Sequence, residues 1–214
     1  MKLHLGCGQR YLEGYVNIDF PLSSHTVQTE SVADLHTDIT TLRYLPGSVA
    51  EVRLHHLFEH FPRPVACGLL ACWHSWLHPG GLLRIEVPDF SRTARIVLNP
   101  FSSFRQRAVA ERHLFGSHEA PWAVHCEGYT PAMLKQLVGC FGFTPLRLER
   151  NAWCGTCNIE LYAVREEGIP DRESAAGRAD RWLRQFLLDE NVEQRLHATW
   201  MEQFAEQLDK GWAT

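Results

Sequence analysis

The sequence predicts an α/β fold followed by a C-terminal helical extension, and two patterns support this prediction. Up to about residue 165, short apolar runs alternate with segments of helical periodicity, an order typical of a sheet built from strand–helix–strand units. From residue 178 onward, apolar residues recur every three or four positions, which predicts helices without strands.

The expected strands are short apolar runs between turn-forming or charged residues. In chain order they cover residues 3–5, 15–18, 31–35, 49–54, 82–87, 144–148 and 158–164. The third run is the weakest of them. A short loop joins the last two runs, so we expect an antiparallel pair there.

Helices are expected between these strands. Apolar residues from Val65 to Leu77 follow a helical spacing, and Pro79-Gly80-Gly81 ends that pattern. Thr130 is a typical N-cap, with Pro131 in the first helical position. Residues 91–125 are less regular, and we interpret them as a lid or insertion over a site.

This reading divides the chain into a principal domain at 1–167, a polar linker at 168–177 and a helical extension at 178–214. Apolar residues of the extension form a stripe, which includes Val192, Leu196, Trp200, Phe204 and Leu208. We expect this stripe to pack either against the domain or against a second copy of the chain, which leaves a homodimer open.

Composition argues against several classes of function. The 214 residues carry a formal net charge of -4 without a long basic run, so nucleic-acid binding is not expected. No apolar stretch approaches the ~20 residues of a membrane span, and the first residues lack a secretory signal pattern. The seven cysteines are irregularly spaced, which is typical of reduced thiols in a cytoplasmic protein.

A glycine turn and an acid follow the first two expected strands. Gly6 and Gly8 would let a ligand lie against backbone N–H groups, and these groups favour an anion. Asp19 could accept hydrogen bonds from the hydroxyls of a ribose. A dinucleotide motif would need a glycine where Tyr11 stands and an acid about 20 residues further on. The pattern therefore favours a nucleoside, or else a tight turn with a surface acid.

Four stretches occur in a characteristic order: KLHLGCG, GYVNIDF, DITTLRYLPGSVAEVRLHHLFEHF and WLHPGGLLRIEVPDF. Together they resemble class I S-adenosylmethionine-dependent methyltransferases. More closely, residues 2–165 resemble small type 11-like bacterial methyltransferases found among polysaccharide and cell-envelope genes. The resemblance implies a Rossmann-like, seven-stranded, mostly parallel sheet with an antiparallel last strand. It also implies S-adenosylmethionine as cofactor and a small-molecule or glycan-like methyl acceptor.

The same resemblance assigns the cofactor contacts. It places the methionine part on Gly6, Cys7 and Gly8, the ribose on Asp19, the adenine on Asp38 and Ile39, and the sulfonium beside His55 and His56. Two departures stand out. About nine residues separate the first two strands, too few for a full crossover helix, so we expect a short or distorted helix there. An N-terminal cap over the site also has no counterpart, so we expect the lid, the extension or a second subunit to exclude water.

A general base is needed only where the acceptor is a protonated hydroxyl or amine. His125, which the resemblance places just before a Gly-Tyr-Thr sequence, is our first candidate, and a buried structural histidine is the alternative. His56, Glu59 and Asp89 are further candidates.

The stretch from His56 to His60 also matches the His-x-x-Glu-His motif of inverted zinc peptidases. That site needs one continuous helix, and Pro62 and Pro64 leave no room for it, so we expect no metal here. Cys154 and Cys157 form a lone C-x-x-C pair, which we interpret as loop cysteines. Two alternatives to a methyltransferase stay open, a non-catalytic nucleoside-binding or scaffold protein and a metal hydrolase.

Overall fold

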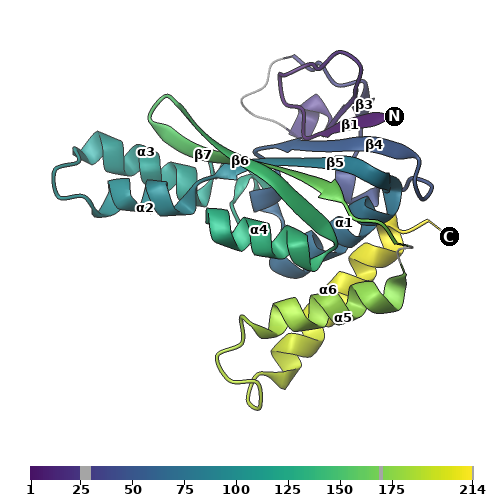
Figure 1. The fold of residues 1–214 in the computed structure, drawn as a ribbon. Helices are drawn as coiled ribbons and strands as arrows, with labels where there is room; N and C mark the ends of the chain where they lie inside the picture. The colour runs from purple at the N-terminus through teal and green to yellow at the C-terminus, as the bar shows by residue number, and fades with distance from the viewer. Residues whose placement is uncertain (25–29, 169–170, 214) are drawn as a thin grey trace.

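The computed structural model describes residues 1–24, 30–168 and 171–213 (Figure 1). Its centre is a seven-stranded sheet in the order β3-β2-β1-β4-β5-β7-β6. The strands are β1 (Lys2–Leu5), β2 (Val16–Asp19), β3 (Leu35–His36), β4 (Val49–His55), β5 (Leu77–Pro88), β6 (Phe143–Trp153) and β7 (Thr156–Arg165). β7 runs antiparallel to β5 and β6, whereas the pairs among β1 to β5 are parallel. The predicted fold class is therefore confirmed.

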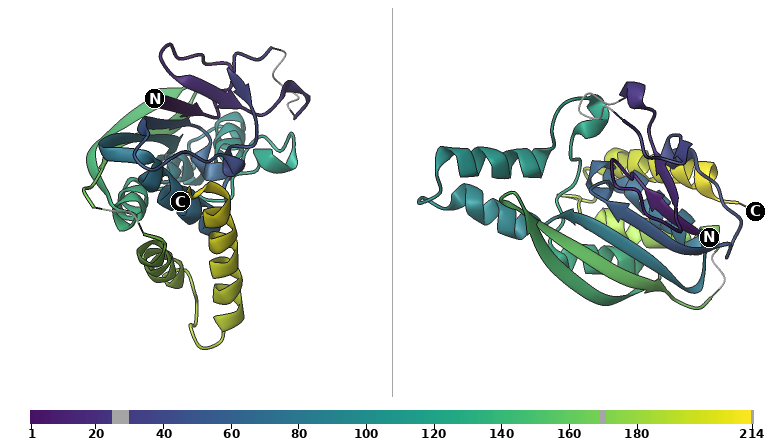
Figure 2. Two further views of the ribbon diagram at one scale, coloured as in Figure 1. Left: turned by 90° about the vertical axis from the view of Figure 1, so that its right-hand side faces the viewer. Right: turned by 90° about the horizontal axis from the view of Figure 1, so that it is seen from above.

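The described chain contains six α-helices. They are α1 (Arg63–Trp76), α2 (Phe90–Leu98), α3 (Phe104–Phe115), α4 (Pro131–Cys140), α5 (Arg172–Arg184) and α6 (Gln194–Gly211). Short 3-10 helices are η1 (Leu22–Ser24), η2 (Ile39–Thr41), η3 (Phe58–His60) and η4 (Pro121–Ala123). Helices α1 and α4 to α6 lie on one side of the sheet, and α2 and α3 project from its end as a hairpin (Figures 1 and 2). Among the described helices, none has the length and apolarity needed to cross a membrane.

The two faces of the sheet differ in polarity. Val52 and Leu54 of β4 and Ile85 of β5 are fully buried in the apolar core. Because side chains alternate along a strand, Arg53 and Glu86 lie on the opposite face. This second face positions the polar groups described below.

The later part of the C-terminal stripe packs against α1, whereas Val192 and Leu196 are exposed. Phe204 and Leu208 are almost completely buried, and Gly68 and Gly211 allow α6 to approach α1 closely, because a Cβ at either glycine would meet the other helix at 2.7 Å. Trp76 Nε1 donates a 2.8 Å hydrogen bond to the Gly211 carbonyl. These residues therefore pack against the domain, which was one of the two partners expected from the sequence. A homodimer stays a prediction.

Three details of the predicted organisation need correction. Helix α5 begins at Arg172, inside the expected linker, because Asp171 caps it by accepting a hydrogen bond from Ser174 N at 2.7 Å. The third strand covers two residues rather than five. The connection from β1 to β2 consists of turns, so the expected short helix is absent among residues 6–15, all of which the structure describes. The division into domain and extension stays a prediction.

Candidate active site

A cavity of about 1320 Å³ opens at the carboxyl ends of β1, β2, β4 and β5. The β1–β2 turn, η2, α3 and the β6–β7 hairpin complete its wall. The residues assigned to the cofactor from the sequence all line it: Gly6, Cys7, Gly8, Asp19, Asp38, Ile39, His55 and His56. The sheet topology therefore brings together groups that lie up to 50 positions apart in the sequence.

The glycine turn and its acid form one structural unit. Gly6 and Gly8 have φ angles of 65° and 55°, which side chains with a Cβ rarely adopt. A Cβ at Gly6 would lie 2.9 Å from the Leu57 side chain. The carboxylate of Asp19 accepts hydrogen bonds from Gly8 N at 2.6 Å and Phe20 N at 2.7 Å. Carboxylate oxygens accept more than one hydrogen bond, so Asp19 can both hold the turn and bind a hydroxyl.

Asp38 stands at the start of η2, shortly after β3, and also lines the cavity. It accepts hydrogen bonds from Thr40 N at 2.9 Å and Thr40 Oγ1 at 2.8 Å, and it is exposed. Its neighbour Ile39 is 5% exposed and gives this part of the cavity an apolar surface. A planar base could pack on Ile39 while its edge meets the Asp38 carboxylate.

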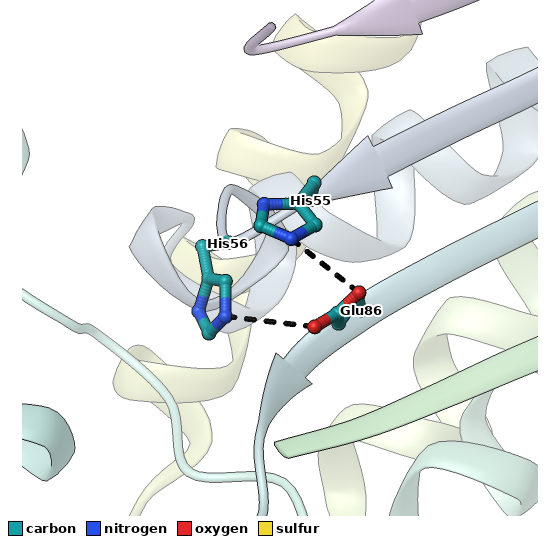
Figure 3. A group of neighbouring side chains, drawn as sticks. All are labelled: His55, His56 and Glu86. Carbon is teal, nitrogen blue, oxygen red and sulfur yellow. Dashed lines mark ion pairs between the residues drawn. The ribbon is translucent and has the colours of Figure 1, made fainter. Parts of the chain in front are cut away.

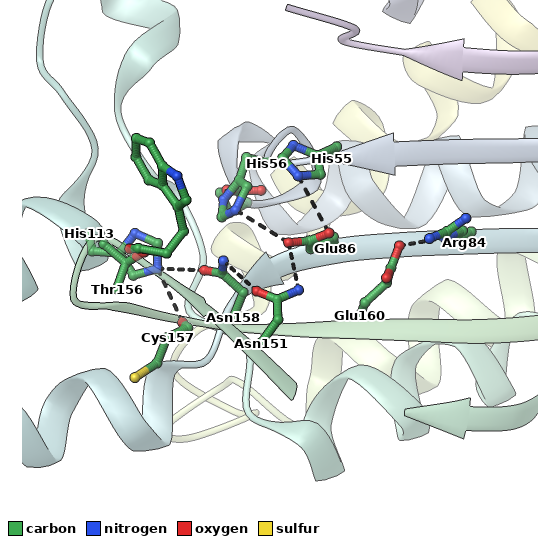
Figure 4. A network of polar contacts seen from close by, with 12 residues as sticks. His55, His56, Arg84, Glu86, His113, Asn151, Thr156, Cys157, Asn158 and Glu160 are labelled. Atoms are coloured by element: carbon green, nitrogen blue, oxygen red, sulfur yellow. Dashed lines mark hydrogen bonds and ion pairs between the residues drawn. The ribbon is translucent and has the colours of Figure 1, made fainter. Parts of the chain in front are cut away.

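Histidines and a buried acid form the opposite wall (Figure 3). Glu86 of β5 lies with one carboxylate oxygen 3.4 Å from His55 Nε2 and with the other 3.8 Å from His56 Nε2. Asn151 Nδ2 donates a 3.0 Å hydrogen bond to Glu86, and Asn158 in turn donates one of 2.9 Å to Asn151 (Figure 4).

The same network reaches α3, in the segment that the sequence led us to interpret as a lid. His113 of α3 is hydrogen-bonded to Asn158 Oδ1 at 2.9 Å and to the carbonyl of Cys157 at 3.1 Å. Burial lowers the pKa of His113. The network therefore connects β4, β5 and the β6–β7 hairpin with the helical hairpin that projects from the sheet.

Glu59 lies behind this wall and is completely buried. Its Oε1 atom lies 3.3 Å from His56 Nδ1 and 3.9 Å from His125 Nε2. Burial opposes ionisation of Glu59, but His56, then His60 and His125, outweigh it and lower the pKa of the carboxyl to about 2. The carboxylate is therefore ionised, although it does not line the cavity.

His125 does line the cavity, and its ring is neutral at pH 7. Burial lowers its pKa to about 4, against the opposing charge of Glu59. The backbone places it firmly, because Cys126 N donates a 2.8 Å hydrogen bond to the Glu59 carbonyl. Burial favours a lower pKa for His56, but the hydrogen bond and the negative charge of Glu59 outweigh it and raise the pKa of His56.

Asp89 does not join the other candidate catalytic residues. It caps α2 by accepting a hydrogen bond from Arg92 N at 3.1 Å, and it lies 3.5 Å from Arg150 Nε. It is fully buried and lies outside the lining of the cavity. Its geometry is that of a helix cap.

Sequence reasoning missed the charged groups on the polar face of the sheet. Arg53 lies 3.8 Å from Glu160, and Arg84 is hydrogen-bonded to the same carboxylate. Burial, with the nearby charge of Arg84, lowers the pKa of Arg53. All three residues line the cavity. The pattern that could have revealed such residues is a charged side chain within an otherwise apolar strand, as in VRLHH and LRIEV.

The His-x-x-Glu-His stretch and the C-x-x-C pair both have placements that need no special function. His56 follows β4 and His60 ends the single turn of η3, so the His-x-x-Glu-His residues do not share the helix that an inverted zinc peptidase needs. Instead, the His60 ring packs edge-on against that of His125 at 4.6 Å. Cys154 and Cys157 lie at the β6–β7 hairpin and are free thiols.

Comparison with known proteins shows the class of fold. No protein-family model matches the sequence, and no curated protein matches it. Solved structures do match: an S-adenosylmethionine-dependent methyltransferase from Methanosarcina mazei has a TM-score of 0.51 and 13% identity, over 78% of this chain and 92% of that one. A chain of the Haloferax volcanii complex between the Trm112 methyltransferase activator and a methyltransferase has a TM-score of 0.54 and 12% identity, over 78% and 82%.

A third match is the 1,6-didemethyltoxoflavin-N1-methyltransferase of Burkholderia thailandensis, which binds 1,6-didemethyltoxoflavin and S-adenosylhomocysteine. Its TM-score is 0.50 and its identity 14%, over 77% of this chain and 70% of that one. At such identities the likeness concerns the fold. The chain has the fold of class I S-adenosylmethionine-dependent methyltransferases.

Proposed function

We propose that this protein is an S-adenosylmethionine-dependent methyltransferase that acts on a small-molecule or glycan-like acceptor. The observation that supports this most strongly is the glycine turn closed by Asp19 at the edge of the large cavity. Such a turn at the carboxyl ends of parallel strands is where nucleosides bind in open α/β sheets.

The residues present fit the cofactor. Gly6 and Gly8 would hold its amino-acid part, Asp19 its ribose, and Asp38 with Ile39 its adenine. When bound, S-adenosylmethionine supplies an electrophilic methyl group on a sulfonium. His125 would take the acceptor proton, because its neutral ring can accept one and lies in the cavity wall. Glu59 would orient His125 and stabilise the charge that it then carries.

Calorimetric binding of S-adenosylhomocysteine to the wild type and to Asp19→Ala tests this proposal. We expect micromolar binding by the wild type and its loss in the variant. Asp34→Ala is a matched control, since Asp34 also accepts a backbone hydrogen bond next to the turn, from Asn17 N at 2.8 Å, but lies outside the cavity. A folded wild type without binding would favour a scaffold protein with the same fold.

A further inference from the structure

Three side chains at the ends of β4 and β5 converge on one point of the cavity wall, namely His55, His56 and Glu86 (Figure 3). One ligand atom of each lies within 4.8 Å of the others, and the two ion pairs measure 3.4 and 3.8 Å. In a tetrahedral zinc site with bonds of roughly 2.0–2.2 Å, ligand atoms stand roughly 3.3–3.6 Å apart. A small closing movement of this triad would therefore give bonding distances.

The backbone of His56 supports a function for this arrangement. Its φ angle is 51°, a conformation that non-glycine residues adopt rarely and at a cost. A 2.9 Å hydrogen bond from His56 N to the Glu86 carbonyl holds the residue there. The turn directs the ring towards Glu86 instead of continuing the strand.

The residues behind the triad have the arrangement of an outer shell around a metal. Histidines that bind metals usually donate their second ring N–H to a carboxylate or carbonyl. Glu59 stands in that position, with Oε1 at 3.3 Å from His56 Nδ1. Glu59 is fully buried, and within the described chain the ring of His56 is the hydrogen-bond donor that its carboxylate faces. Asn151 orients Glu86 through its 3.0 Å hydrogen bond.

We propose that His55, His56 and Glu86 bind one divalent transition-metal ion of the zinc class. This proposal replaces two expectations from the sequence, the absence of a metal in this stretch and the placement of the sulfonium beside the two histidines. Two imidazoles and one carboxylate suit zinc, and three protein ligands with an open position are typical of catalytic rather than structural sites. The open position faces the cavity. A second possible group, Glu59 with His60 and His125, is less suitable because Glu59 does not line the cavity.

The site also narrows the acceptor, a step that rests on the proposed function. The ion would bind the acceptor through an oxygen and stabilise the negative charge that develops on it. The acceptor would thus be a hydroxyl compound. Its O–H proton passes to His125 as the new O–CH3 bond forms and the S–CH3 bond breaks, which leaves neutral S-adenosylhomocysteine.

Cobalt titration of the chelator-treated wild type tests the metal site through a visible absorption spectrum, without need of an acceptor. We expect one Co²⁺ per chain, displaced by Zn²⁺. Glu86→Gln and His55→Ala should each weaken binding at least tenfold, and Glu59→Gln should weaken it about 10- to 100-fold. Glu160→Gln is the matched control, because Glu160 pairs with Glu86 across the strands but lies outside the triad. Circular dichroism identifies any variant that fails to fold.

The outcomes separate this inference from the proposed function. S-adenosylhomocysteine binding without cobalt binding would overturn the metal site and leave the methyltransferase intact. Cobalt binding lost in His60→Ala but kept in Glu86→Gln would also overturn it, since the ion would then occupy the second group. Cobalt binding that follows the triad, without S-adenosylhomocysteine binding, would support the metal site and contradict the methyltransferase.

Discussion

The cavity has two halves that are built by different means. The glycine half consists of Gly6, Gly8, Asp19 and η2, where backbone N–H groups and two carboxylates meet the ligand space. The histidine half consists of His55, His56, His125 and the acids that face them, Glu59 and Glu86.

This difference in construction predicts which property of the enzyme each half controls. The glycine half depends on backbone geometry, namely the φ angles of Gly6 and Gly8 and the hydrogen bonds that the turn makes with Asp19. The histidine half depends on buried titratable groups whose charges are coupled. We therefore expect the glycine half to set the affinity for the cofactor and the histidine half to set the rate.

The largest expected effect is that of His125→Gln on the rate. Loss of a general base lowers kcat by about 10²- to 10⁴-fold, whereas the Kd of S-adenosylhomocysteine should stay within about threefold. Because the pKa of His125 is lowered to about 4, the wild-type ring stays neutral as the pH falls from 8 to 5, and this group should not lower the rate there. Transfer of a radiolabelled methyl group to an acceptor found by screening measures both. A decrease below threefold would remove His125 from the mechanism.

Gly6→Ala should disturb the glycine half and weaken the binding of S-adenosylhomocysteine. The alanine must adopt a φ angle of 65° and place its Cβ 2.9 Å from Leu57, so the turn must shift to relieve the strain and the contact. We expect the Kd of S-adenosylhomocysteine to rise about 100-fold. Gly14→Ala is the matched control, because its φ angle is 80° but no atom lies within 4 Å of the added Cβ. It should cost about 1–2 kcal/mol in stability and leave the Kd unchanged. Equal Kd values for the two variants would contradict a role of the turn in binding.

The two halves also differ in how well the sequence predicts them. The glycine half is local, because one turn joins two consecutive strands. Its glycines and the acid that follows them can therefore be recognised directly in the sequence. The histidine half gathers residues from β4, η3, β5 and the segment before α4, so its contacts depend on the sheet order. Glu86 was missed for this reason, although it and Arg84 are the two charged residues of the run LLRIEVP.

Similar causes explain the errors in the fold. Asp89 was a candidate catalytic residue from the sequence, but it lies between β5 and α2, and its carboxylate caps that helix. The linker at 168–177 was predicted from its glycines and charges, yet Asp171 begins α5 within it. In both cases a polar side chain next to a helix start serves as a cap, which short-range composition does not distinguish from a catalytic or linker residue.

Acid should act on the glycine half through His4, which is fully buried in β1. Burial lowers its pKa to about 4, against the hydrogen bond with Asn17. Between pH 6.5 and 4 the unfolded chain then binds this proton and the folded chain does not, so stability falls as the pH falls through that window. The loss is about 2 kcal/mol by pH 5. Urea denaturation at pH 7 and pH 5 measures this loss of stability. In His4→Gln the loss should be smaller than in the wild type by about 2 kcal/mol. Equal losses in the two proteins would contradict this assignment.

The smallest expected effect concerns a contact that supports the histidine half from outside. Arg63 bonds Glu127 at 2.7 Å and lies 3.6 Å from the centre of the Phe186 ring, so it connects the C-terminal helices to the segment that carries His125. Arg63→Ala should cost about 1 kcal/mol in urea denaturation, since the pair is partly exposed. Arg184→Ala, which removes an exposed ion pair with Asp180, is the control and should leave the free energy of unfolding almost unchanged. If the contact positions His125, kcat falls a few-fold in Arg63→Ala while the Kd of S-adenosylhomocysteine stays constant. A rise in that Kd would instead show that the two halves are mechanically coupled.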